Sequence, residues 1–175
     1  MNDPYEQARA QRSALERLTA RIPGFAGFQD RELRRDVDKL QREHLAEELR
    51  RIKGKARELA RSYTDAGQIG LLDRFARLER GLDRLGQSVR FADYGASGLF
   101  DPVKIGEPEL VRLYEFDLAL LDDLADLERH VEAVPEPGQG DPEAGMEAVL
   151  ARVRALDARW SERETLLSGV ARIPR

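Results

Sequence analysis

The chain has 175 residues, of which 35% are charged and 41% hydrophobic, with a formal net charge of −4 and no cysteine. These totals exclude disulfide and thiolate chemistry, argue against a dedicated nucleic-acid binder, and suit one domain over residues 1–175. No apolar run approaches the ~20 residues that span a bilayer, and the first residues lack a signal-peptide pattern, so we expect a cytoplasmic protein. The many arginines beside few lysines suggest a GC-rich bacterial genome.

The first predicted helix covers about residues 4–21. Asp3 can cap its start, and Pro4 suits the first helical position. Its apolar stripe is thin, so we expect it to lie against other helices. Pro23 ends it and opens a turn with two phenylalanines, Phe25 and Phe28. We interpret this turn as a structured corner packed on the end of the bundle; an exposed docking loop is the alternative.

The second predicted helix, about residues 29–65, has apolar residues mostly three or four positions apart, which places them on one face. One step of five, from Leu40 to Leu45, breaks the repeat and favours a straight or locally unwound helix. Gly54 marks a soft point, at a cost of roughly 1 kcal/mol relative to alanine.

The same helix carries a basic face, formed by Arg50, Lys53, Arg57 and Arg61. A phosphate-bearing partner, either membrane lipid or nucleic acid, could bind there. Because glutamates intrude on this face, a solvated surface with i,i+4 ion pairs is the preferred interpretation. A third interpretation is that the basic face contacts an acidic helix face, either inside the bundle or on another copy of the chain.

The third predicted helix, about residues 68–93, has the cleanest heptad-like apolar repeat, and its short link to the second predicts an antiparallel hairpin. A loop follows that is rich in glycine and proline and therefore cannot be helical. It nevertheless contains apolar residues that a disordered linker rarely needs, so it is either packed or used for docking. The candidate protein contacts in this loop are Tyr94, Leu99, Phe100 and Ile105.

The last two predicted helices cover about residues 108–134 and 142–168. The first has a wide apolar stripe, which indicates a central helix with several neighbours, and an acidic outer face. Asp117 occupies a stripe position in it, so we expect a buried carboxylate that meets an arginine or a hydroxyl group. A structural ion pair is preferred to a functional acid, because no second polar group is evident at its level.

Catalytic or metal-binding equipment is not evident in the sequence. His44 and His130 lie on different predicted helices without a partner at metal-ligand spacing, and no glycine-rich phosphate loop is present. We expect no enzymatic activity, no cofactor and no small-molecule substrate.

Several stretches carry a family resemblance. The opening Ile22-Pro23-Gly24-Phe25-x-Gly27-Phe28, followed by Arg31-Glu32, Arg34-Arg35 and Asp38-Lys39-Leu40, resembles that of a group of small bacterial all-helical proteins without an established function. Ser97-Gly98-Leu99-Phe100-Asp101 and Leu113-Tyr114-x-Phe116-Asp117 are similar to later stretches of that group. The resemblance implies a helical fold and carries no activity, cofactor or ligand.

Together these features predict an all-α fold, an elongated antiparallel bundle of four long helices with an N-terminal helix against it. The predicted function is a non-enzymatic interaction or scaffold protein that self-associates or docks on a larger assembly. Its contact region would be the Phe25–Phe28 corner with the Tyr94–Ile105 loop. The alternative is a phosphate-surface binder that uses the Arg50–Arg61 face.

Overall fold

The computed structural model describes residues 4–22, 33–92 and 107–171. Within these ranges the chain forms helices and short connections, as the sequence predicts for an all-α fold. The helices are α1 (Pro4–Arg21), α2 (Leu33–Asp65), the 3-10 turn η1 (Ile69–Leu71), α3 (Leu72–Phe91), α5 (Glu107–Glu132) and α6 (Pro142–Ala171).

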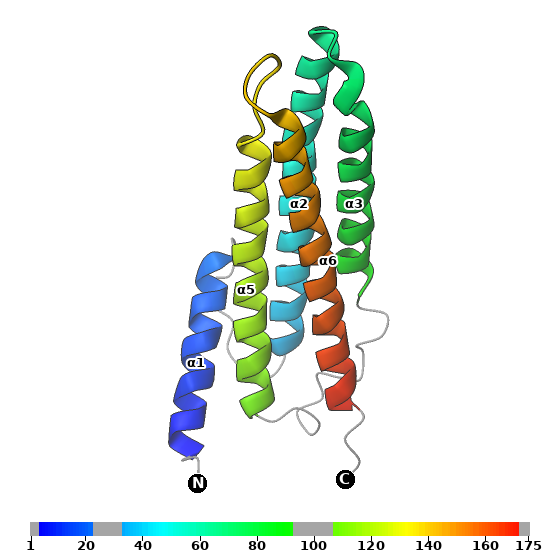
Figure 1. The fold of residues 1–175 in the computed structure, drawn as a ribbon. Coiled ribbons are helices and arrows are strands. Elements are labelled where there is room, and N and C mark those ends of the chain that lie inside the picture. The colour runs from blue at the N-terminus through cyan, green and yellow to red at the C-terminus, as the bar shows by residue number, and fades with distance from the viewer. Residues whose placement is uncertain (1–3, 23–32, 93–106, 172–175) are drawn as a thin grey trace.

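The four long helices form two antiparallel hairpins that pack side by side (Figure 1). One hairpin is α2–α3 and the other is α5–α6; α2 packs on α5, and α3 packs on α6. Helices α2 and α5 run in one direction and α3 and α6 in the other. Helix α1 lies outside this bundle and packs on α5, as expected for the N-terminal helix.

The core follows the apolar stripes that the sequence predicts, because each helix turns its apolar face toward the other helices. Helix α3 shows this most plainly, with five buried residues at three- and four-residue spacing: Phe75, Leu78, Leu82, Leu85 and Val89. The wide stripe of α5 is also explained, since this helix contacts α1, α2 and α6. No helix in the described ranges is both long and apolar enough to cross a membrane.

Of the two forms expected for the second helix, straight or locally unwound, the structure shows no local unwinding. Helix α2 runs without interruption through the step from Leu40 to Leu45. The core positions at this level are occupied by polar residues: Asp38, Gln41 and Arg42 are all buried. The three- and four-residue spacing of core positions therefore continues, and it slips only when apolar residues alone are counted.

The helix ends follow local turn chemistry. Gly67, with φ of +71°, ends α2, and the N–H of Gln68 donates to the carbonyl of Tyr63 at 2.9 Å. At the start of α6, the carboxylate of Asp141 accepts from the N–H of Ala144 at 3.0 Å and so caps the helix. Several ends differ from expectation: α3 covers only Leu72–Phe91 after the 3-10 turn η1, α5 stops at Glu132, and α6 continues to Ala171.

Candidate functional site

The six apolar residues predicted as a protein-contact patch lie outside the described residues. They are Phe25, Phe28, Tyr94, Leu99, Phe100 and Ile105. The helix ends next to these two segments are described. Helices α2 and α5 begin, and α3 ends, toward the same end of the bundle (Figure 1).

Most of the predicted basic face of α2 is paired with carboxylates. Arg50 pairs with Glu47 one turn earlier, while Lys53 and Arg57 pair across the hairpin with Asp83 and Glu79 of α3. Arg61 is exposed and forms no ion pair with the described residues. The face is thus a set of short-range ion pairs, several of them between helices instead of within α2.

The predicted acidic face of α5 also faces other helices instead of solvent alone. Glu128 accepts hydrogen bonds from Arg51 and Lys55 of α2. The hydrogen bond from Arg51, opposed in part by burial, lowers the pKa of Glu128 to about 2. Two further carboxylates of α5 meet α1: Glu115 pairs with Arg17, and Asp122 pairs with Arg21.

A groove of about 670 Å³ lies between α2 and α3. Leu49 and Leu82 lie at its base, and two glycines, Gly54 of α2 and Gly86 of α3, leave its walls open. A Cβ atom added to either glycine would meet no heavy atom within 4 Å. The groove therefore exists because two facing helices lack side chains where they would otherwise fill the space between them.

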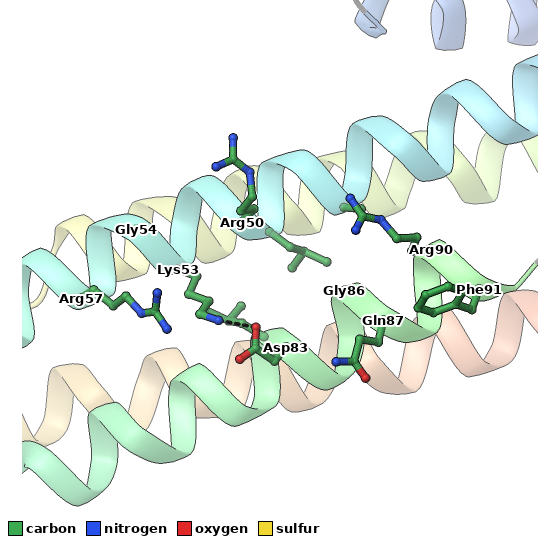
Figure 2. A pocket seen from close by; sticks show the side chains of 12 residues that line it. Arg50, Lys53, Gly54, Arg57, Asp83, Gly86, Gln87, Arg90 and Phe91 are labelled. Atoms are coloured by element: carbon green, nitrogen blue, oxygen red, sulfur yellow. Dashed lines mark hydrogen bonds and ion pairs between the residues drawn. The ribbon is translucent and has the colours of Figure 1, made fainter.

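The walls of the groove are mainly cationic. Figure 2 shows Lys53 and Arg57 extending from α2 toward α3, with the Lys53–Asp83 ion pair crossing the gap. Arg90 extends from the last turn of α3 toward α2, whereas the guanidinium of Arg50 points away from α3. Asp83 is the one carboxylate among the lining residues.

Two residues at the end of the groove were missed by the sequence reasoning. The guanidinium of Arg90 forms no ion pair with the described residues, and Phe91 is 61% exposed. The signal was present in the sequence, because Phe91 follows Val89 by two positions and so leaves the apolar stripe of α3. Aromatic residues are enriched at protein contact surfaces, so an exposed ring at the end of a groove is a candidate contact.

A second polar feature lies inside the bundle and connects α2, α5 and α6. Asp117 and Arg163 are each only 1% exposed. The Nε of Arg163 donates to one carboxylate oxygen of Asp117 at 2.6 Å, and Nη2 donates to the other at 3.2 Å. Nη2 also donates to Asp38 at 2.8 Å, and Asp38 accepts from Arg42 at 2.8 Å. The buried charge expected at Asp117 thus has its arginine partner.

The expectation that no second polar group lies at the level of Asp117 is wrong. The four charged groups form a balanced network of two carboxylates and two guanidiniums, Asp38, Asp117, Arg42 and Arg163. Gln41 is fully buried beside them and lies close enough to Asp117 to favour its ionised form. The amide of Gln41 and the indole N–H of Trp160 have no hydrogen-bond partner that meets normal geometry among the described residues.

Burial and charge oppose each other in this network. Burial raises the pKa of Asp117 above its ordinary value, and the facing charge of Arg163 offsets only part of that effect. Burial lowers the pKa of Arg163, but the carboxylates of Asp117 and Asp38 outweigh it and raise the pKa above its ordinary value. Arg163 therefore stays protonated and holds both carboxylates, in addition to lying 5.1 Å from the ring of Trp160.

The two histidines take no part in this network. His44 is half-buried on α2, and the Nδ1 of His130 lies 2.8 Å from the carbonyl oxygen of Asp126 on its own helix. Within residues 4–22, 33–92 and 107–171, no group of three or more histidine or carboxylate side chains is arranged to hold a metal ion.

No protein-family model, curated protein or solved structure matches this chain. The resemblance of its opening to small bacterial helical proteins therefore stays a prediction.

Proposed function

We propose that this protein is a non-enzymatic interaction or scaffold protein that presents the α2–α3 groove to a protein partner. The observation that carries the proposal is the exposed aromatic ring of Phe91 at the end of a concave strip. Aromatic and arginine side chains beside an apolar pocket are typical of protein-binding surfaces. Here Arg90 supplies the arginine.

The rest of the bundle supports this role because it holds the groove in a fixed shape. Ion pairs join α2 to both α3 and α5, and further pairs join α3 to α6, including Arg84 with Asp157 at 3.0 Å. The buried network connects α2, α5 and α6. A preformed surface loses less conformational entropy when a partner binds, so a rigid bundle suits a scaffold.

The buried charges favour a structural role over a catalytic one. Each carboxylate of the network already accepts from a guanidinium, and Arg163 already donates to two carboxylates. Asp117 and Arg163 are also each only 1% exposed, so neither is within reach of a substrate at the surface. The network is therefore assigned to fixing the register of three helices.

The proposal is tested by comparing two exposed apolar residues at opposite ends of the α2–α3 hairpin. Phe91→Ser removes the ring at the groove, and Ile69→Ser removes a side chain that is 67% exposed in the distant turn η1. We expect affinity capture of a partner, or self-association in light scattering, to be lost with Phe91→Ser and kept with Ile69→Ser. Equal association of both variants, with unchanged melting temperatures, would contradict the groove as the contact surface.

The predicted corner and loop are tested in the same assay. If the Phe25–Phe28 corner and the Tyr94–Ile105 loop form a contact patch, Phe25→Ser and Phe100→Ser will weaken association without loss of thermal stability. If these rings belong to the core, the variants will instead melt earlier and associate normally.

The alternative function is binding to a phosphate-bearing surface through Arg50, Lys53, Arg57 and Arg61. The convergence of three of these cations on one groove supports it. Their carboxylate partners count against it, because each ion pair must be opened before a phosphate can replace the carboxylate. Binding that falls steeply between low and physiological salt would favour this alternative.

A further inference from the structure

The lining of the α2–α3 groove specifies the chemistry of what it can bind. Four cations line it, Arg50, Lys53, Arg57 and Arg90, against one carboxylate, Asp83. Adding the paired glutamates Glu47 and Glu79 brings the count to four cations and three carboxylates. The groove is therefore locally cationic on a chain whose formal net charge is −4. An acidic ligand complements it.

The groove also requires an apolar component in its ligand. Leu49 and Leu82 form its base, and Phe91 presents an aromatic ring at one end. Between Ala46 and Arg57, which both line it, α2 rises about 17 Å, or about three helical turns. These dimensions and the open glycine walls match one short helix laid along the groove.

We propose that the groove binds a three-turn acidic amphipathic helix of a partner protein, an inference that rests on the proposed function. Its apolar side chains lie on the floor beside Gly54 and Gly86 and against Phe91. Its carboxylates bind Arg90, and the ion pairs of Lys53 with Asp83 and of Arg57 with Glu79 stay closed along the groove wall. The apolar floor favours this ligand over a lipid or nucleic-acid phosphate, which would use the cations alone.

The binding test uses a synthetic 14-residue peptide labelled for fluorescence anisotropy. Its leucines are three and four positions apart, so they share one helix face, and its glutamates lie on the other face. A second peptide replaces every glutamate with glutamine and keeps the apolar face. We expect the acidic peptide to bind at physiological salt, and the glutamine peptide to bind about tenfold more weakly or worse. Equal binding of the two peptides would overturn the inference, because charge complementarity is one of its two supports.

Two variants test separately the two features on which the inference depends, the open apolar groove and its cationic walls. Gly86→Leu fills the groove without changing charge, and the open space around this glycine lets the fold accept it. Arg90→Glu reverses one wall charge. The control is Arg80→Glu, an equal charge change at an exposed position of α3 that does not line the groove. We expect at least a tenfold loss of affinity for the first two and less than a twofold change for the control.

Other outcomes overturn the inference in recognisable ways. If duplex DNA or phosphatidylserine vesicles bind, and Arg90→Glu weakens this while Gly86→Leu does not, the groove is a phosphate surface. If the peptide binds Gly86→Leu as tightly as the wild type, the groove is not its site. If neither peptide binds but capture of a partner still depends on Phe91, the proposed function stands and the acidic helix is wrong.

Discussion

At the scale of single residues, the most consequential group is Arg163. It is almost fully buried and donates to carboxylates on two other helices. Its burial is tolerated because Asp117 and Asp38 neutralise it, and their own burial is tolerated for the same reason. Such a network adds little net stability over well-packed apolar residues, but removing one partner leaves charges buried without compensation.

Replacing Arg163 with methionine should therefore destabilise the fold strongly. We expect Arg163→Met to lower the free energy of unfolding by about 3–5 kcal/mol, because Asp117 and Asp38 lose their shared partner. Urea denaturation followed by circular dichroism measures the change. The matched control is Arg159→Met on the same helix, which breaks the half-exposed pair with Asp123 and should cost less than about 1 kcal/mol. Similar losses for both variants would show that burial of the network is not what makes Arg163 important.

The lowered pKa of Glu128 makes the stability of the fold depend on pH in the acid range. Its pKa is about 2 when folded, against 4.5 for the unperturbed group, so it stabilises the fold above pH 4.5. That contribution falls as the pH drops from about 4.5 to about 2. The pH dependence of stability contributed by Asp117 has the opposite sign. Its raised pKa favours the protonated form in the folded state, so the stability that it contributes is largest at low pH and is lost as the pH rises.

The Glu128→Gln variant isolates the first effect. We expect it to be less stable than the wild type by about 1 kcal/mol near pH 6 and to converge with it toward pH 2. Urea denaturation at a series of pH values measures the difference. A constant difference across this range would mean that ionisation of Glu128 contributes nothing to folding.

At the scale of elements, the glycines show how context decides the meaning of one residue type. Gly54 lies in the interior of α2, which runs through it without a break, and its surroundings leave room for a side chain. Gly67 ends the same helix with φ of +71°, a conformation that costs other residues energy. The two glycines are thirteen positions apart and should respond oppositely to substitution.

Alanine substitutions make this contrast measurable. We expect Gly54→Ala to raise the free energy of unfolding by up to about 1 kcal/mol, because alanine is the better helix former. Gly67→Ala should lower it by about 1 kcal/mol, because the left-handed conformation must be kept. Thermal unfolding of the two variants compares them directly. A shift in the same direction for both would contradict the roles assigned here.

At the scale of the whole molecule, α1 stands apart from the four-helix bundle. It packs mainly on α5, through buried residues such as Leu18 and through exposed ion pairs, including Arg21 with Asp122 at 2.9 Å. Exposed pairs of this kind contribute little, so the buried apolar residues Ala14, Leu18 and Ile22 provide most of the attachment. Helix α1 should therefore open without unfolding of the rest.

Amide hydrogen exchange tests this order of opening. We expect the amides of α1 to exchange faster than those of α2, and Leu18→Ala to accelerate exchange in α1 by about tenfold or more. Exchange in α2 should not change. Arg12→Ala, at a position that is highly exposed, serves as the control. Uniform acceleration across all helices would show that α1 is part of one cooperative unit with the bundle.

Much of the fold could be predicted because it depends on local chemistry. The cap at Asp141, the glycine that ends α2 and the apolar stripe of α3 each depend on residues close together in the chain. The slip in the apolar repeat of α2 falls where Asp38, Gln41 and Arg42 occupy core positions. A search for apolar periodicity cannot recognise a core position that is polar, because the residues that neutralise it lie on other helices.

The amino-acid sequence by itself determined which segments are helical, where most of them begin and end, and which face of each turns inward, since helix propensity, capping and periodicity act over a few residues. The tertiary structure alone decided which charges meet. Asp117 faces Arg163 from 46 positions away, and Arg90 and Phe91 gain their place at the end of the groove only when α3 folds back along α2. Electrostatic and packing energies depend on distance in space, and for these residues the distance is set by the assembled bundle.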